Sequence, residues 1–149
     1  MLKFVVNNLN VAQLPEIWET VEDKNLSDKD LKTKYFIWAL NNVRGKIINN
    51  KSIKHGISIA RDGLGEWKTA TKSREQVLSI KLLAALLENA EYWQEKPHIP
   101  PDPNIEKVIY LRQHCRVNNK DYTAIITVKV YKAQRRHKYY HHYLDDFLL

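Results

Sequence analysis

The sequence of 149 residues contains one cysteine, Cys115, which excludes an internal disulfide framework and a zinc site built on several thiolates. No run approaches the 18 or more apolar residues of a membrane span, and the apolar start is too short for a signal peptide. A glycine-rich phosphate loop and the motifs HExxH and GxSxG are also missing. We therefore expect no membrane span and none of the enzyme classes that these motifs mark.

Glycine and proline are scarce, and they divide the chain where they occur. Two of the four glycines stand in the segment 61–66, which predicts a sharply bent loop. Four of the five prolines lie between residues 97 and 103. Proline cannot continue a helix and disfavours helix in the residue before it. The segment 97–103 is thus expected to be an extended crossover loop within one domain.

Acidic residues are outnumbered, with 17 Asp and Glu against 24 Lys and Arg, for a net charge of +7. A basic chain favours an anionic partner: nucleic acid first, an acidic protein second and a membrane surface third. The hydrophobic content of 44%, with four Trp and eight Tyr, is sufficient for a packed core. These numbers predict one folded domain with an anionic partner.

Residues 1–45 have the pattern of a helical N-terminal extension. Pro15 suits the first turn of a helix over 16–22, and Ser27 is a good N-cap for a second helix with Leu31 and Tyr35 on one side. Because no chemistry is evident here, we interpret this segment as a packing, linker or entry module. The working domain is expected to span 46–149.

The middle of the chain predicts two short strands, over 46–48 and 57–59, and then a long helix over 74–93. Ser73 and Gln76 form a capping box, and leucine, valine, isoleucine and alanine follow at helical spacing. So broad an apolar face should lie against a sheet. The expected fold class is α+β, with N-terminal helices followed by a long helix packed on a curved antiparallel sheet.

The last fifty residues contain three strand-like runs, with a polar turn over 118–120 and a basic loop over 132–136. Alternation gives the first two strands one apolar face and one polar face. The third run, 137–144, could present either set of its side chains, so its register stays open. Nine Lys and Arg lie between residues 107 and 142 against one acid, Asp121. The C-terminal sheet is therefore the expected functional surface.

Such a surface suits cleavage of RNA without a metal ion. The reaction needs a base for the 2′-hydroxyl, an acid for the leaving 5′ oxygen and cations that stabilise the phosphorane. Histidine serves either proton transfer, although an exposed histidine is more often plain surface. His137 and His141 are too far apart along a strand for a direct metal clamp, so no metal or other cofactor is expected. The candidate catalytic residues are Lys68, Lys129, Tyr140, His141 and His142. The candidate substrate contacts are Thr69, Thr127, Lys132, Arg135, Arg136 and Tyr139.

The order of helix, proline-bearing loop and three strands resembles the barnase–EndoU–colicin–RelE group of metal-independent ribonucleases. The runs GISIARDGLGEWKTATKSREQ, LLAALLENAEYW, DYTAIITVKVYK and KYYHHYL are similar to a branch found in contact-dependent inhibition toxins and phage polyvalent proteins. The resemblance covers about 46–146. It implies a toxin that cleaves RNA, expected to be tRNA, and leaves cyclic-phosphate ends. It also implies a monomer with a cognate immunity protein or antitoxin, acting in the cytoplasm of a target cell, delivered alone or within a larger protein.

The positions carried over from this resemblance are Lys68, Lys129, Tyr140 and His142, with Thr127 as a phosphate contact. Which of His141 and His142 faces the substrate stays open. Two tyrosines are followed directly by two histidines here, so the register of the strand is ambiguous. Two other functions fit the same basic sheet. One is a non-catalytic nucleic-acid-binding module, and the other is a phage accessory domain whose positive face meets an acidic protein.

Overall fold

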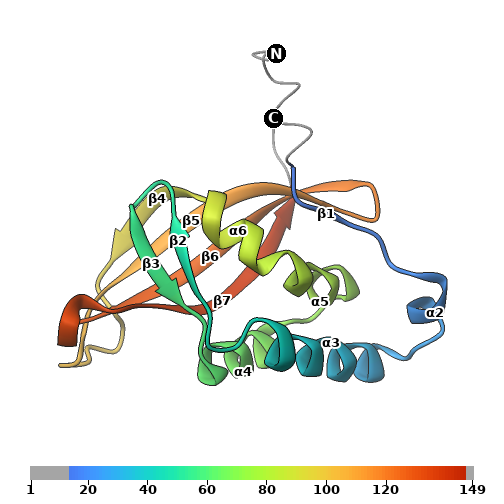
Figure 1. Ribbon diagram of the computed structural model, residues 1–149, viewed down its shortest axis with the longest axis horizontal. Helices are drawn as coiled ribbons and strands as arrows, with labels where there is room; N and C mark the ends of the chain where they lie inside the picture. The colour runs from blue at the N-terminus through green and yellow to red at the C-terminus, as the bar shows by residue number, and fades with distance from the viewer. Residues whose placement is uncertain (1–13, 147–149) are drawn as a thin grey trace, which may run out of the picture.

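The computed structural model describes residues 14–146 and has the expected α+β fold, with helices on one face of a curled sheet (Figure 1). The sheet order is β1-β5-β6-β7-β3-β2, and β4 pairs with β5 on the same side as β1. The strands are β1 (Glu16–Ile17), β2 (Ile47–Asn50), β3 (His55–Ser58), β4 (Glu91–Lys96), β5 (Ile105–Val117), β6 (Lys120–Tyr131) and β7 (His137–Asp146). The helices are α2 (Val21–Lys24), α3 (Asp28–Asn42), α4 (Arg61–Ala70), α5 (Arg74–Ser79) and α6 (Leu83–Asn89), with short 3-10 turns at Ile80–Leu82 and Ala133–Arg135.

Strands β5, β6 and β7 form the expected antiparallel meander. Asn118 and Asn119 adopt positive φ in the tight turn between β5 and β6, as a two-residue hairpin requires. Apolar side chains of β5 and β6, such as Leu111 and Ile126, are buried beneath the helices. The sheet as a whole is mixed, since β1 pairs with β5 and β3 pairs with β7 in parallel.

A bulge in β7 settles the register that alternation leaves open. His141 lies opposite Thr127, but Tyr139 lies opposite Val128, so Tyr140 is an extra residue with no partner of its own on β6. An extra residue shifts the alternation of side chains by one position. Tyr139 therefore shares the buried face with His142, whereas simple alternation would place it with His141, one residue earlier.

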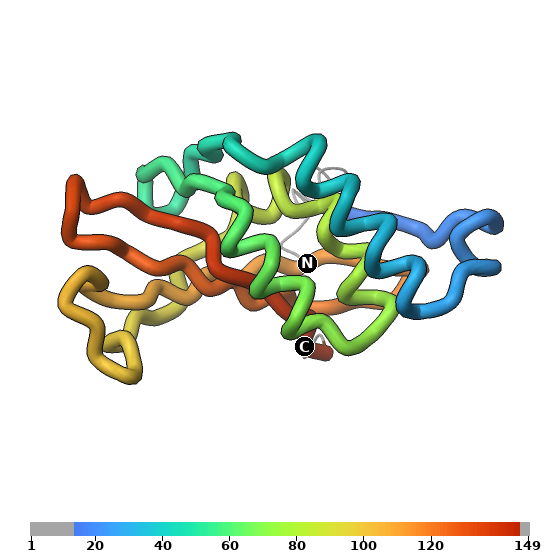
Figure 2. The backbone as a smooth tube through the Cα atoms, turned by 90° about the horizontal axis from the view of Figure 1, so that it is seen from below, coloured from blue at the N-terminus to red at the C-terminus, as the bar shows by residue number. Residues whose placement is uncertain are grey.

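The N-terminal segment is part of the domain's core. Leu31, Tyr35 and Ala39 of α3 are fully buried in the same apolar cluster as the sheet, and Ser27 caps α3 as predicted through a bond from the Asp30 amide. Viewed from below, α3 and α4 run across the same face of the molecule (Figure 2). The boundary expected after residue 45 thus corresponds to no break in the packing.

The helix predicted over 16–22 is wrong. Glu16 and Ile17 instead extend the sheet as β1 beside the end of β5, and the Asn118 amide donates to the Ile17 carbonyl at 2.9 Å. Only the short helix α2 follows. The partners of β1 lie about a hundred residues away, where local sequence patterns carry no information.

The helix predicted over 74–93 begins correctly but ends early. Ser73 accepts the Gln76 amide as the N-cap, while α6 ends at Asn89 and Tyr92 and Trp93 belong to strand β4. Asn50 causes this end: its buried side-chain amide donates to the carbonyls of Leu87 and Ala90 at 2.7 and 2.8 Å. These bonds satisfy carbonyls that a helix terminus leaves unpaired. Among the described helices, none is long and apolar enough to cross a membrane.

Replacing Asn50 by alanine is expected to lower the free energy of unfolding by about 3 kcal/mol, because buried carbonyls lose their donors. The amides of Ser52 and Ile53, which bond the Asn50 side-chain oxygen at 2.9 Å, lose their acceptor as well. Urea denaturation measures the change. Asn49 is exposed and lies next to Asn50 in the same strand, so Asn49→Ala is the control. It should change the free energy of unfolding by less than about 0.5 kcal/mol. Equal effects of the two substitutions would contradict the role of Asn50.

Candidate active site

A pocket of about 290 Å³ lies where α4 meets the bulged part of β7. Three elements contribute to it: α4, β6 and β7. The lining residues are Asp62, Gly63, Glu66, Lys129, Tyr131, Lys138, Tyr139 and Tyr140. We refer to this set as the β7 pocket. It contains two of the residues predicted as catalytic, Lys129 and Tyr140.

Two lysines face each other across the strands in the β7 pocket. Lys129 and Lys138 are direct cross-strand partners on β6 and β7, and like charges placed opposite each other are destabilising. Each amine lies over a tyrosine ring, at 3.6 Å from Tyr140 for Lys129 and 5.1 Å from Tyr131 for Lys138. Such a pair costs stability, and an anionic ligand between the two amines would offset that cost.

The bulged residue Tyr140 connects this lysine pair to α4. Its hydroxyl donates to the Glu66 carboxylate at 2.6 Å. That bond, followed by burial, raises the pKa of Tyr140 to about 12. At neutral pH the phenol therefore keeps its proton and can serve as a donor.

His141 lies against the same tyrosine, with its ring centroid 4.7 Å from that of Tyr140. Burial lowers the pKa of His141; the charge of Lys129 lowers it too, while Glu66 acts in the opposite direction. Its Nδ1 atom is buried and has no hydrogen-bond partner among the described residues. A neutral imidazole, a phenol fixed by a hydrogen bond and two lysine amines are together the groups that proton transfer near a phosphate requires.

His142, the other histidine of the pair, is not part of an open surface. It is 1% exposed, with Nε2 at 2.8 Å from the Ser79 hydroxyl and Nδ1 at 2.8 Å from the Tyr139 hydroxyl. Of the two candidate histidines, His142 is therefore the one that lies in the core. Tyr139 is 1% exposed as well, although it contributes to the lining of the β7 pocket. The bulge at Tyr140 is the physical reason, because it turns His141 outward and His142 into the core.

Lys68 lies apart from the β7 pocket. It is two residues after Glu66 on α4, and residues at that spacing do not share a helix face. Its amine lies 4.8 Å from the ring centroid of Phe36 on α3, and its side chain lines a second pocket between α3, α4 and α5. The expectation that Lys68 joins Lys129 in one cleft is therefore wrong. Thr69, the next residue, is exposed near the end of α4.

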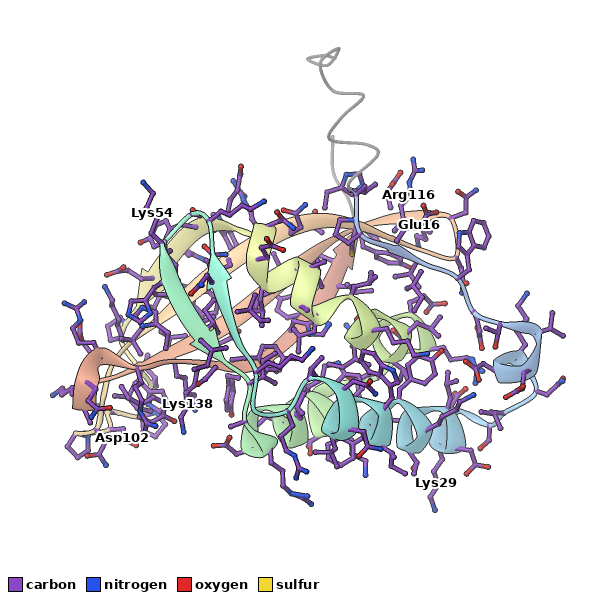
Figure 3. All side chains as sticks on the ribbon, viewed as in Figure 1. Glu16, Lys29, Lys54, Asp102, Arg116 and Lys138 are labelled. Atoms are coloured by element: carbon purple, nitrogen blue, oxygen red, sulfur yellow. The ribbon has the colours of Figure 1, made fainter. Side chains whose placement is uncertain are left out.

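The other predicted substrate contacts lie in two places, one within the sheet and three in the loop between β6 and β7. Thr127 is 5% exposed and lies opposite His141 on the sheet. Lys132, Arg135 and Arg136 are exposed in the loop between β6 and β7, where Arg135 forms an ion pair with Glu106 at 3.7 Å. Figure 3 shows Lys138 near that loop, well away from Lys29 on α3. The loop cations thus lie beyond the end of the sheet that carries Lys138.

Sequence reasoning missed the acidic wall of the β7 pocket. Asp62 and Glu66 are four residues apart, which places both carboxylates on one face of α4. This spacing was available in the sequence, but the two glycines between 61 and 66 were interpreted as a loop. The remaining missed residues, Lys138 and Tyr131, follow from the register of β6 and β7.

A family model described as large polyvalent protein-associated domain 3 matches residues 27–140. The chain belongs to this family. Searches of curated proteins and of solved structures each found no match. The residues that line the β7 pocket, and those that line the second pocket beside Lys68, all lie within the matched range of the large polyvalent protein-associated domain. The association with polyvalent proteins confirms that part of the expected resemblance.

Proposed function

We propose that this large polyvalent protein-associated domain is a metal-independent endoribonuclease whose reaction takes place at the β7 pocket. The observation that carries the proposal is the convergence of Lys129, Tyr140 and His141 with the Glu66 carboxylate. These groups supply a proton acceptor, a proton donor and positive charge, which are the requirements for cleaving RNA through its own 2′-hydroxyl. The net charge of +7 favours an RNA substrate.

Each group has a role that follows from its surroundings. The neutral imidazole of His141 takes the proton of the 2′-hydroxyl as that oxygen attacks phosphorus. Tyr140 gives its proton to the leaving 5′ oxygen, and Lys129 and Lys138 stabilise the charge that builds on the phosphorane oxygens. Glu66 is a positioning residue, since it holds the Tyr140 hydroxyl. The products are a 2′,3′-cyclic phosphate and a 5′-hydroxyl end.

The biological setting proposed with this activity follows the resemblance to toxins. The substrate would be tRNA, the site of action would be the cytoplasm of a target cell, and a cognate immunity protein or antitoxin would protect the producer.

The test is incubation of total tRNA with the purified protein in excess EDTA. We expect cleavage with cyclic-phosphate ends, and a loss of roughly 10²–10³-fold in rate for Lys129→Gln, since removal of one transition-state donor has that effect. Lys120→Gln is the matched control, because it removes the same charge from the other end of β6. Tyr140→Phe and His141→Asn should also lose most of the activity, while the far-UV spectrum of every variant stays unchanged.

Two outcomes would contradict the proposed mechanism. One is cleavage that disappears in EDTA and returns with a divalent ion. The other is a rate for Lys129→Gln equal to that of Lys120→Gln. Glu66→Gln separates positioning from chemistry, because glutamine can still accept the Tyr140 hydrogen bond. We expect a smaller loss for Glu66→Gln than for Tyr140→Phe.

A second function, RNA binding without cleavage, is favoured by exposed aromatic side chains on strands β4 and β7. Trp93 and Tyr143 are 41% and 39% exposed, and the Arg112 guanidinium lies 5.3 Å from the centroid of the Trp93 ring. Exposed aromatics beside cations are a base-stacking surface in many RNA-binding proteins. Salt-sensitive binding of tRNA that is recovered intact would support this function over the nuclease.

A further inference from the structure

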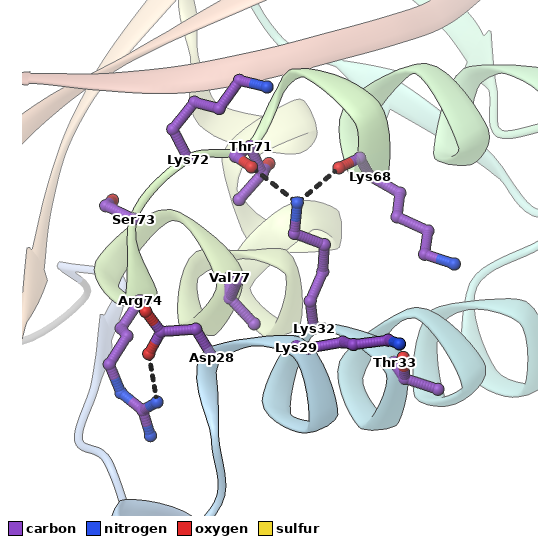
Figure 4. Close-up of a pocket in the computed structure, with 10 residues that line it drawn as sticks. All are labelled: Asp28, Lys29, Lys32, Thr33, Lys68, Thr71, Lys72, Ser73, Arg74 and Val77. Atoms are coloured by element: carbon purple, nitrogen blue, oxygen red, sulfur yellow. Dashed lines mark hydrogen bonds and ion pairs between the residues drawn. The ribbon is translucent and has the colours of Figure 1, made fainter.

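The second pocket lies between α3, α4 and α5 and has a volume of about 360 Å³, and five of its ten lining residues are Lys or Arg. Figure 4 shows its lining residues, which are Asp28, Lys29, Lys32, Thr33, Lys68, Thr71, Lys72, Ser73, Arg74 and Val77. We refer to it as the lysine pocket. Its volume lies within the range of small-molecule sites, roughly 300–1,000 Å³.

The positive charge of the lysine pocket is not balanced by its one acid. Asp28 bonds to Arg74 at 2.7 Å, and the Arg74 guanidinium is otherwise occupied by Glu19 and by the carbonyls of Asp23 and Leu26. Within residues 14–146, no ion pair joins a carboxylate to any of the four lysine amines. Four lysines therefore share a concave surface without a protein counterion.

Lys32 forms a fixed cationic group in this pocket. Its amine donates to the carbonyls of Lys68 and Thr71 at 3.0 and 2.8 Å, where α4 ends (Figure 4). An ammonium has three donors, so these bonds leave one for a ligand. Burial lowers the pKa of Lys32, and the charges of Lys72 and Lys68 lower it further, so a bound anion would relieve this repulsion.

Thr71 provides an independent indication of a polar ligand. Its side chain is 1% exposed, and its hydroxyl oxygen has no hydrogen-bond partner among the described residues. A buried hydroxyl without a partner costs free energy, and most such groups in native proteins are bonded. This unsatisfied hydroxyl belongs to the residue whose carbonyl holds Lys32.

We propose that the lysine pocket binds the phosphate group of a nucleotide or of a nucleic-acid strand. Lys29, Lys32, Lys68 and Lys72 would contact the phosphate oxygens, while Val77 and the lysine stems contact the apolar part of the ligand. Lys68 is therefore a binding residue of this pocket rather than part of the reaction centre. This inference is independent of the proposed nuclease activity, because it requires no cleavage.

Calorimetric titration with adenosine 5′-monophosphate, inorganic pyrophosphate, adenosine and a ten-nucleotide DNA tests the proposal. DNA lacks the 2′-hydroxyl that the proposed nuclease needs, so binding is measured without cleavage. We expect binding of the phosphate-bearing probes and none of adenosine. Lys29→Gln and Lys72→Gln, both exposed at the rim, should each weaken phosphate binding by about fivefold to tenfold through loss of a charge-assisted bond.

Lys54→Gln is the matched control, because it removes the same charge from the β2–β3 turn, far from Lys29 in Figure 3. Loss of binding of both the monophosphate and the DNA in the rim variants would show that a strand phosphate occupies the pocket. Loss for the monophosphate alone would identify a free nucleotide as the ligand. Binding of adenosine equal to that of its monophosphate, or equal losses in Lys54→Gln and the rim variants, would overturn the proposal.

Discussion

Gly63→Ala is expected to destabilise the fold by at least about 3 kcal/mol, whereas Gly65→Ala, two residues along the same helix, is expected to stabilise it. A Cβ at Gly63 would overlap the backbone carbonyl oxygen of Tyr139, and backbone cannot rotate away as a flexible side chain can. At Gly65 no atom lies within 4 Å of the added carbon. Alanine there gains about 0.5–1 kcal/mol in a helix interior.

The two glycines form a matched pair, since each substitution adds one methyl group to α4. Thermal and urea unfolding of both variants measure the difference. Should Gly63→Ala still fold, α4 must move away from β7, and the Glu66–Tyr140 hydrogen bond must lengthen. Tyr140 in that variant would then titrate at a lower pH than in the natural sequence. Equal stability of the two alanine variants would contradict the close approach of α4 to β7.

The same helix shows where sequence reasoning ends. Two glycines in six residues are typical of a loop, yet Gly63 is required by a contact with Tyr139, a residue 76 positions later. The end of α6 depends in the same manner on Asn50, which is distant in sequence. Local patterns correctly predict the caps at Ser27 and Ser73, because a cap is a contact between residues three positions apart.

The sequence predicted those parts of the candidate site that depend on the alternation of side chains along a regular strand. Lys129 lies on the polar face of β6, as its position in the strand indicates. The bulge at Tyr140 breaks alternation in β7, and a bulge leaves no clear mark in a single sequence. It therefore decides which histidine is outside, and the structure assigns that place to His141. The predicted association of Lys68 with Lys129 failed because α4 was not recognised as a helix.

A pH dependence of stability follows from the histidine that the bulge turns inward. Burial, and to a smaller extent the nearby His141, lower the pKa of His142 to about 3, from 6.5 for an ordinary histidine. The neutral ring is fully used: the Ser79 hydroxyl donates to the Gln76 carbonyl, so His142 Nε2 donates to Ser79 while Nδ1 accepts from Tyr139. A second proton would place a donor against the Tyr139 hydroxyl in the core.

Below about pH 6.5 the unfolded chain binds a proton on His142, whereas the folded chain binds it only near pH 3. As the pH falls through this interval, proton binding therefore lowers the free energy of the unfolded state relative to that of the folded state. The free energy of unfolding should drop by up to about 1.4 kcal/mol per pH unit from this residue alone. Above pH 6.5 the contribution is complete and constant.

Urea denaturation at half-unit steps from pH 7.5 to 4 measures this slope in the natural sequence and in His142→Gln. The variant is expected to be less stable at pH 7 but to lose stability less steeply with acid, because its core side chain takes up no proton. His98→Gln, in the loop between β4 and β5, changes the same residue type outside the core and should keep the original slope. The remaining acid sensitivity in this range belongs to groups such as His137 and His141, whose pKa values burial also lowers from 6.5. Parallel curves for the natural sequence and His142→Gln would contradict this prediction. They would mean that His142 binds a proton as readily in the folded chain as in the unfolded chain, despite its buried bonds to Ser79 and Tyr139.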